Sequence, residues 1–349
     1  MNKLKVVTVL GTRPEIIRLS VIIKKFDQFF DHTLVHTGQN YDYTLNEIFF
    51  EELEIRKPDF FLEVVGQDLG ETMGNVLSKS YKLFSELKPD ALLVLGDTNS
   101  ALCTISAKRL KIPIFHMEAG NRCFDQNVPE ELNRKIADHT SDINLTYTEN
   151  SRRYLLAEGF RKDHVFCVGS PLKEVLDFYS DQINGSLILE KLQLNKEKYI
   201  VASIHREENL DIGDNLKNII DALNKITDLY DAQLIFSTHP RTKKKIEQLN
   251  LKVSSRISFV EPLGFCDYVF LQKNALITLS DSGTISEEST ILGFKAVSIR
   301  TSTERPEAID HGNIVLGGIT TDSIINSINI TLGLEGESNP PLEYLKTDN

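Results

Sequence analysis

The chain has 349 residues, with 39 Lys and Arg against 50 Asp and Glu, a formal net charge of −11 and 41% hydrophobic residues. The length is sufficient for two domains, and the acidic balance argues against a nucleic-acid-binding surface. No apolar run reaches the roughly 18 residues that a membrane span needs. The four scattered cysteines (Cys103, Cys123, Cys167 and Cys266) form no zinc motif and favour a cytoplasmic location.

Short apolar runs alternate with helical stretches along the first half of the chain. The runs predict strands at residues 6–10, 33–36, 91–95, 112–116, 143–147 and 165–168. Helical patterns lie between them, for example at residues 69–87 and 129–139. Apolar runs without polar alternation, separated by helices, are typical of parallel strands that are covered on both faces.

The same alternation starts again after a polar segment at residues 180–198. Strands are predicted at residues 199–204, 233–237, 275–279 and 295–299, and helices at residues 215–229 and 284–292. The sequence therefore predicts an α/β protein with two doubly wound, Rossmann-like domains that face a cleft. We place the first domain at residues 1–178, the second at residues 179–333, and a loose surface tail at residues 334–349.

Polar and charged residues follow one predicted strand after another. The first strand is followed by "GTRPE", the strand at 91–95 by "GDTNS", and the strand at 112–116 leads into "HMEAGNR". In the second half the corresponding segments are "HREEN", "STHPR", "SDSGT" and "RTSTERPE". Ligands in open α/β sheets bind at the carboxyl ends of strands, so these segments define the candidate site.

The first turn lacks the G-x-G-x-x-G pattern of a dinucleotide-binding domain and offers Arg13 instead. Arginine suits phosphate groups because its donors form a planar fork, and Arg305 stands in a similar loop beside a proline. Ser282 and Gly283 lie between a strand and a helix, where free N–H groups and the helix dipole suit a phosphate. An ordinary helix cap explains this turn equally well.

Three carboxylates, Asp97, Glu118 and Glu130, lie in consecutive strand-end or helix-start segments. Acid–base chemistry fits them better than metal binding, since they lack a dense D-x-D arrangement. Glu130 could pair with Arg134 four residues later, or simply complement the helix dipole. His205 and His239 both close strands of the second half, beside the predicted phosphate site.

The ordered motifs "GTRPE", "GDT", "EAG.R", "PEE.NR", "HREEN", "DSG", "EE" and "ERPEA" resemble the non-hydrolysing UDP-N-acetylglucosamine 2-epimerase family. The resemblance extends over residues 5–318. It implies a glycosyltransferase-B-like fold, a UDP-sugar in the interdomain cleft and a homodimer. It also implies that neither a nicotinamide cofactor nor an essential metal takes part.

Carried over position by position, the resemblance assigns the catalytic roles to Asp97, Glu118, Glu130 and His205. It does not say which carboxylate is the base and which is the acid. The implied substrate-binding positions are Arg13, Arg18, His239, Tyr268, Ser282, Gly283, Glu288 and Arg305. Among them, Arg13 and Arg305 resemble anion-binding arginines, Glu288 a ribose-binding glutamate, and Tyr268 a uracil-packing aromatic residue.

Three departures from the common family pattern affect the expected substrate. They are Glu207 in "HREEN", the segment "QNYDYTLNEIFF" with Tyr43, and "EAGNRCFDQNVPEE". All three resemble the branch that forms UDP-N-acetyl-L-fucosamine from a UDP-6-deoxy-L-talosamine precursor for capsule and O-antigen synthesis. The expected substrate is therefore UDP-2-acetamido-2,6-dideoxy-L-talose or UDP-N-acetylglucosamine. The alternative function is a glycosyltransferase of the same fold with a UDP-sugar donor.

Overall fold

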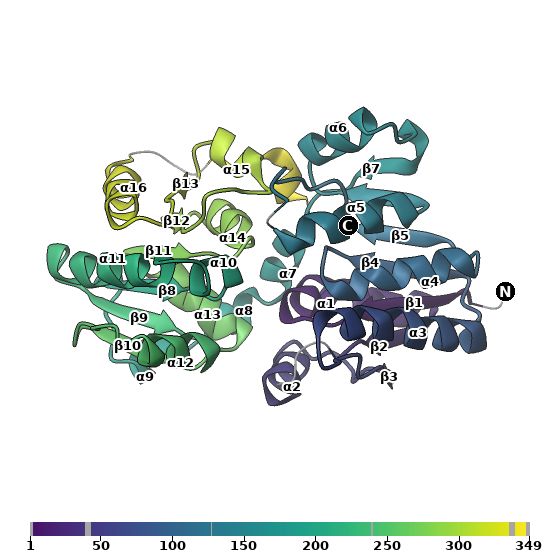
Figure 1. Ribbon diagram of the computed structural model, residues 1–349, viewed down its shortest axis with the longest axis horizontal. Coiled ribbons are helices and arrows are strands. Elements are labelled where there is room, and N and C mark those ends of the chain that lie inside the picture. The colour runs from purple at the N-terminus through teal and green to yellow at the C-terminus, as the bar shows by residue number, and fades with distance from the viewer. Residues whose placement is uncertain (1–2, 39–42, 127, 239, 335–338, 347–349) are drawn as a thin grey trace. The chain divides into compact units, whose positions relative to one another are not determined.

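The structure is a computed structural model that describes residues 3–38, 43–126, 128–238, 240–334 and 339–346. It divides the chain into two compact units (Figure 1). The first unit comprises Met1–Phe178 with Leu342–Asn349, and the second comprises Tyr179–Pro341. Each unit is built on its own parallel sheet.

The sheet of the first unit has seven parallel strands in the order β3-β2-β1-β4-β5-β6-β7. The strands are β1 (Lys5–Leu10), β2 (Asp31–His36), β3 (Phe60–Phe61), β4 (Ala91–Leu95), β5 (Ile114–Met117), β6 (Ile143–Thr146) and β7 (Val165–Cys167). The helices are α1 (Arg13–Phe29), α2 (Tyr43–Glu52), α3 (Leu69–Leu87), α4 (Cys103–Arg109), α5 (Pro129–Thr140), α6 (Glu149–Ala157) and α7 (Leu172–Phe178). Three short 3₁₀ turns complete the unit: η1 (Asn99–Leu102), η2 (Lys162–His164) and η3 (Leu342–Leu345).

One core of this unit lies between the sheet and helices α3 and α4. Val7 and Val9 of β1 belong to the same buried cluster as Phe84 of α3 and Ala107 of α4. Burial of large apolar side chains contributes roughly 2 kcal/mol each to stability. The continuous apolar runs of the sequence therefore become central strands because both faces of the sheet need apolar side chains.

The second unit has six parallel strands in the order β10-β9-β8-β11-β12-β13. They are β8 (Tyr199–Ser203), β9 (Gln233–Ser237), β10 (Ile257–Val260), β11 (Ile277–Ser280), β12 (Ala296–Ser298) and β13 (Val315–Leu316). The helices are α8 (Ser180–Asn184), α9 (Ile188–Lys191), α10 (Glu207–Leu210), α11 (Asn215–Leu229), α12 (Pro240–Gln248), α13 (Phe265–Lys273), α14 (Ile285–Leu292), α15 (Pro306–Asp310) and α16 (Thr321–Gly333). Apolar residues of α11 and α16, such as Leu223 and Ile328, share a buried cluster with Ile200 and Leu279 of the sheet.

The strand order reverses at the same place in both units, so that β1 lies beside β4 and β8 lies beside β11. Such a reversal leaves an opening at the carboxyl ends of the two strands, which is where doubly wound proteins bind ligands. The predicted α/β fold class with two parallel sheets is confirmed. The sequence did not predict strands β3, β10 and β13, which lie at sheet edges.

The segments outside the sheets are also ordered, and the expectation of a loose tail is wrong. The polar stretch at residues 180–198 contains helices α8 and α9, and it buries Ile183, Ile188 and Leu189. The predicted loose tail is also ordered at its end, because η3 contacts α7 and Tyr344 is 0% exposed. Among the described residues, no helix is long and apolar enough to cross a membrane.

Candidate active site

The turn after β1 shows why this chain has a single glycine there. A Cβ at Gly11 would lie 2.0 Å from Thr37 Oγ1 and 2.3 Å from Ser100 Oγ, so only glycine fits. Thr12 caps helix α1, and Glu15 completes a capping box with it. Tight packing against neighbouring strand ends thus fixes the turn, and a side chain, Arg13, is left to reach a ligand.

Arg13 is the first residue of α1 and Arg18 is the sixth, yet they have different surroundings. Arg13 is exposed, and its guanidinium carbon lies 5.6 Å from the centroid of the Phe49 ring. Arg18 is 2% exposed and donates from Nη1 to Glu118 Oε2 at 2.5 Å. Of the two, Arg13 is placed to meet a solvent-borne anion, whereas Arg18 holds a predicted catalytic carboxylate.

Glu118 and Asp97 are both held by buried arginines. Glu118 has a left-handed backbone, with a φ of 65°, and its side chain is 12% exposed. Asp97 Oδ2 accepts from Nε and Nη2 of Arg134, at 2.8 and 2.7 Å. A bidentate arginine fixes the position of a carboxylate as well as its charge. The structure therefore orients both groups at the carboxyl ends of β4 and β5.

Glu130 differs from the other two carboxylates. It is the second residue of α5 and is half-buried. Of the two alternatives for Glu130, the structure does not favour the pair with Arg134, because Arg134 bonds to Asp97 and to Glu131, the latter at 2.9 Å. Among the described residues, Glu130 takes part in no ion pair, so its carboxylate keeps its hydrogen-bonding capacity for a ligand.

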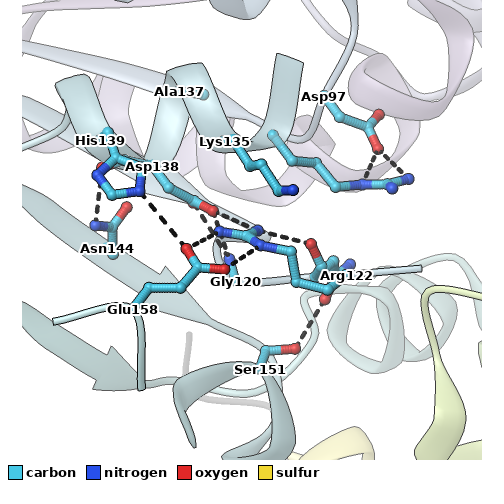
Figure 2. Close-up of polar contacts among 12 residues, drawn as sticks. Asp97, Gly120, Arg122, Lys135, Ala137, Asp138, His139, Asn144, Ser151 and Glu158 are labelled. Atoms are coloured by element: carbon cyan, nitrogen blue, oxygen red, sulfur yellow. Dashed lines mark hydrogen bonds and ion pairs between the residues drawn. The ribbon is translucent and has the colours of Figure 1, made fainter. Parts of the chain in front are cut away.

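A buried network of charged side chains lies next to these carboxylates (Figure 2). Asp138 of α5 accepts from Arg122 Nη1 at 2.7 Å and bonds to His116 Nδ1 at 2.9 Å. Glu158 binds the other edge of the Arg122 guanidinium with two hydrogen bonds, at 2.8 and 2.7 Å. His116 and Arg122 lie within the segment "HMEAGNR", but the sequence predicted no role for either of them. Asp138 lies in no motif that indicated a function.

In the second unit, His205 follows β8 and lies against Asp281, which follows β11. His205 Nδ1 lies 3.1 Å from Asp281 Oδ1, and the backbone N–H groups of His205 and Arg206 also donate to this carboxylate. Burial alone would raise the pKa of Asp281, but the charge and hydrogen bond of His205 and the other donors hold it below its usual value. The carboxylate therefore fixes one ring nitrogen of a half-exposed histidine and leaves Nε2 for a ligand.

The turn before α14 is packed closely against other side chains. A Cβ at Gly283 would lie 2.3 Å from Glu304 Oε1, and Glu304 is itself bonded to Arg300 Nη1 at 2.7 Å. Ser282 Oγ lies 2.9 Å from Thr284 Oγ1 and accepts from the Thr284 N–H. Glycine is therefore needed here for close packing, and the loop is held rigid from within.

The remaining predicted binding residues of this unit have diverse environments. Arg305 is 3% exposed and lies 2.6 Å from Glu287 Oε2, so part of its donor set is already engaged. Glu288 accepts from Gln272 Nε2 at 3.1 Å, and Tyr268 is partly buried on α13. His239 lies outside the described residues, as do the side chains of Tyr43 and Glu207.

Comparison with known proteins identifies the family of this chain. A family model described as UDP-N-acetylglucosamine 2-epimerase matches residues 24–345. The chain belongs to this family. The UDP-N-acetylglucosamine 2-epimerase of Methanocaldococcus jannaschii is 37% identical over 339 residues, which cover 94% of this chain and 92% of that one. The fold class, the isomerase chemistry of the non-hydrolysing type and the family predicted from the motifs are thereby confirmed.

Solved structures and a second curated relative extend the comparison. The structure of the M. jannaschii enzyme in complex with UDP-GlcNAc and UDP is 36% identical, with a TM-score of 0.91 and coverage of 96% and 95% of the two chains. A Rickettsia bellii UDP-N-acetylglucosamine 2-epimerase is 44% identical, with a TM-score of 0.90 and coverage of 99% and 94%. The UDP-2,3-diacetamido-2,3-dideoxy-D-glucuronate 2-epimerase of Pseudomonas aeruginosa is 34% identical over 335 residues, which cover 95% and 93%.

Proposed function

We propose that this family member inverts C2 of a UDP-N-acetylhexosamine by eliminating UDP and adding it back. The C2 proton is not adjacent to a carbonyl group and is therefore a poor acid. When the C1–O bond to UDP breaks, positive charge develops on the ring and the C2 proton can leave to a base. The products are UDP and a 2-acetamidoglucal. Return of a proton to the opposite face of C2, with attack of the UDP oxygen on C1, gives the epimer.

The observation that supports this proposal is the group of carboxylates in the first unit. Asp97 and Glu118 are oriented by arginines, while Glu130 takes part in no ion pair in the described part of the chain. Proton transfer on both faces of C2 requires at least two acid–base groups, which these carboxylates supply. We assign His205, oriented by Asp281, to the same reaction as a stabiliser of the leaving group or a proton carrier.

Departure of UDP also requires positive charge and N–H donors near the diphosphate. We assign Arg13 and the Ser282–Gly283 turn to this role, with Glu288 at the ribose and Tyr268 at the uracil. We assign Arg305, which also pairs with Glu287, to the same role as a second anion-binding arginine. His239 keeps its predicted role as a further binding residue.

Two observations bear on the identity of the sugar: the names of the relatives and the departures of this chain from the common family motifs. The names of the M. jannaschii and R. bellii relatives favour UDP-N-acetylglucosamine, while the P. aeruginosa relative acts on a different UDP-sugar at similar identity. The departures at Tyr43 and Glu207 favour UDP-2-acetamido-2,6-dideoxy-L-talose, and with it a role in capsule or O-antigen synthesis. We propose the 6-deoxy-L-talo sugar as the better substrate. A homodimer and a cytoplasmic location are part of the same proposal.

Deuterium incorporation tests the reaction. Wild-type enzyme is incubated with each UDP-sugar in deuterated water, and the products are followed by NMR. Epimerisation by elimination should place deuterium at C2 and leave C3 to C5 unlabelled. A glycosyltransferase breaks only the C1–O bond, so transfer of sugar to an acceptor with C2–H intact would refute the epimerase assignment.

Competition between the two substrates tests the sugar. With both present, the kcat/KM ratio should favour the 6-deoxy-L-talo sugar by at least tenfold, since a polar site that lacks its partner discriminates strongly. Faster conversion of UDP-N-acetylglucosamine would place the chain with its named relatives and reject the interpretation of Glu207.

A further inference from the structure

The network of Asp138, Arg122 and Glu158 (Figure 2) continues through His116 to the backbone before Asp97. His116, near the end of β5, bonds through Nε2 to the carbonyl oxygen of Gly96 at 2.8 Å. The N–H of Gly96 in turn donates to the carbonyl of Met117 at 3.0 Å. Both peptide groups of Gly96 are therefore held by β5, one residue before Asp97.

The same carboxylate that binds His116 also holds the chain after Glu118. The N–H of Gly120 lies 3.2 and 3.3 Å from the two oxygens of Asp138. Gly120 has a φ of 78°, and a Cβ there would lie 2.4 Å from the carbonyl oxygen of Ser151. Asp138 thus connects the two loops, one through His116 and the other directly.

The hydrogen bonds define the charge of His116. One ring nitrogen faces a carbonyl oxygen and the other faces a carboxylate, and neither of these groups can donate while Asp138 is ionised. Both ring nitrogens must then carry protons. Burial lowers the pKa of His116, but Asp138, Gly96 and Glu118 raise it more, so that the net change is upward. These partners favour the protonated, positively charged form of the ring.

The charges of the network balance without any group from outside it. Asp138 is 0% exposed and is shared between His116 and Arg122, while Glu158 binds the other edge of Arg122. The network then holds two cations and two anions, and removing one partner would leave an uncompensated buried charge. His139 lies 3.6 Å from Glu158 at the exposed end of the network.

We propose that His116, held by Asp138, is a positioning residue of the epimerase reaction, which fixes the loop of Asp97 and supplies a buried positive charge near Glu118. The proposal rests on the proposed function, because it takes Asp97 and Glu118 as catalytic residues. His116 itself touches no reacting atom. It acts by holding the carboxylates of Asp97 and Glu118 in their positions relative to the substrate. Small displacements of such groups lower the rate by up to about 10²-fold.

Two substitutions separate the two effects. His116→Asn keeps a donor near the place of Nδ1, for Asp138, but cannot reach the Gly96 carbonyl. His116→Gln reaches the position of Nε2 and can bond to Gly96, but it carries no charge. We expect kcat to fall about 10²-fold in H116N and about tenfold in H116Q, with KM and UDP affinity nearly unchanged.

A histidine at the opposite end of the same sheet is the matched control. His32 Nδ1 bonds to Asp27 at 2.6 Å and Nε2 bonds to Thr8 Oγ1 at 2.9 Å, with a side chain that is 1% exposed. His32→Gln changes the hydrogen bonds of an equally buried histidine ring at the start of β2. It should lower the melting temperature to a similar extent and leave kcat per folded enzyme at the wild-type value.

The experiment measures kcat, KM, UDP affinity and melting temperature for wild type, H116N, H116Q and H32Q. Wild-type kcat retained in folded H116N would overturn the positioning role, as would an equal loss of kcat in H32Q. Absence of C2 inversion by the wild type itself would instead overturn the proposed function.

A second measurement depends on no single variant being active. Histidines are labelled with ¹⁵N, and the signal missing from H116Q identifies His116. At about pH 6.5, the pKa of a free imidazole, most His116 rings should carry protons on both nitrogens. A neutral ring would overturn the buried charge even if H116N did not fold.

Discussion

Glu15 and Asp281 are buried carboxylates beside the reversal point of their sheets, and their surroundings move their pKa values in opposite directions. Within the described part of the chain, Glu15 accepts hydrogen bonds from neutral donors alone: the N–H of Gly11, the N–H and hydroxyl of Thr12, and the hydroxyl of Thr98. Burial outweighs these donors and raises the pKa of Glu15 to about 7. Asp281 has an imidazole and two backbone N–H groups, and its pKa is lowered.

The first prediction concerns Glu15→Gln, which imitates the protonated acid. A pKa raised from 4.5 to about 7 means that the native state binds the proton more tightly than the unfolded chain. The protonated Glu15 therefore stabilises the native state. This contribution to the unfolding free energy, about 3 kcal/mol, is fully present below pH 4.5 and is lost as the pH rises through 7. Between pH 4.5 and 7 the unfolding free energy of wild type should therefore fall relative to that of E15Q. Urea titrations at a series of pH values measure this difference. A difference that does not change with pH would contradict it.

The second prediction concerns Asp281→Asn. The amide cannot accept from all the N–H groups that now converge on the carboxylate, and it no longer fixes the tautomer of His205. We expect kcat to fall by about 10² or more, as when the orienting carboxylate of a catalytic histidine is removed elsewhere. Wild-type stability from Asp281 is present above its unfolded pKa and is lost as the pH falls. The test is to measure kcat and UDP affinity of the folded variant. An unchanged kcat would contradict a catalytic role of His205.

At the scale of elements, the strand-to-helix turns combine rigidity with exposed function. Gly11 follows β1 and Gly283 precedes α14, and each faces a side chain within 2.3 Å of where its Cβ would be. Those neighbours are held in turn by hydrogen bonds: Thr37 Oγ1 lies 2.8 Å from Ser100 Oγ, and Glu304 binds Arg300. The turns are therefore fixed by packing beneath them, so the groups above them need little ordering when a ligand binds.

The third prediction follows for Gly283→Ala. The new methyl group would displace Glu304 and weaken its pair with Arg300, at a cost of about 1–3 kcal/mol in unfolding free energy. UDP affinity should fall with it, because the displaced loop carries Ser282. Gly74→Ala is the control: it lies in the exposed interior of α3 with no atom within 4 Å of its Cβ. That change should be neutral or stabilise by up to about 1 kcal/mol. Equal changes in unfolding free energy for G283A and G74A would contradict the close packing of Gly283 against Glu304.

At the scale of the whole molecule, the two units repeat one topology, and the end of the chain returns to the first unit. Tyr344 of η3 is fully buried, and the carbonyl oxygen of Glu343 lies 2.7 Å from the place of a Cβ on Gly169. The segment Leu342–Asn349 belongs to the first unit although it follows the whole of the second. The stability of the first unit therefore depends on residues that follow the second unit in the sequence.

The fourth prediction concerns Tyr344→Ala. Removing a buried aromatic ring costs about 3–5 kcal/mol, and the loss should fall on the first unit alone. Calorimetry should show one transition moved to lower temperature while the transition of the second unit, probed with UDP, stays in place. Leu342, which is 81% exposed, supplies the control L342A, expected to change stability by less than about 0.5 kcal/mol. If Y344A and L342A behaved alike, the docking of η3 would be of no energetic importance.

The sequence by itself determined the alternation of strands and helices, the fold class, the family and the segments at the carboxyl ends of the strands. Apolar runs such as residues 91–95 and 233–237 predicted β4 and β9 because a strand covered on both faces needs apolar side chains throughout. Edge strands such as β3 and β13 escaped prediction, since each has only two residues and takes its pairing from a neighbour distant in sequence.

Only the tertiary structure decided which charges meet. Arg134 binds Asp97 from a helix 37 residues away, and Arg18 binds Glu118 across 100 residues. Asp281 and Asp138 acquire their roles in the same way, because a carboxylate in a turn or on a helix has the same local sequence whether it is solvated or buried. Hydrogen-bond partners are selected by the packing of the sheet, and that packing brings together residues that no local pattern connects.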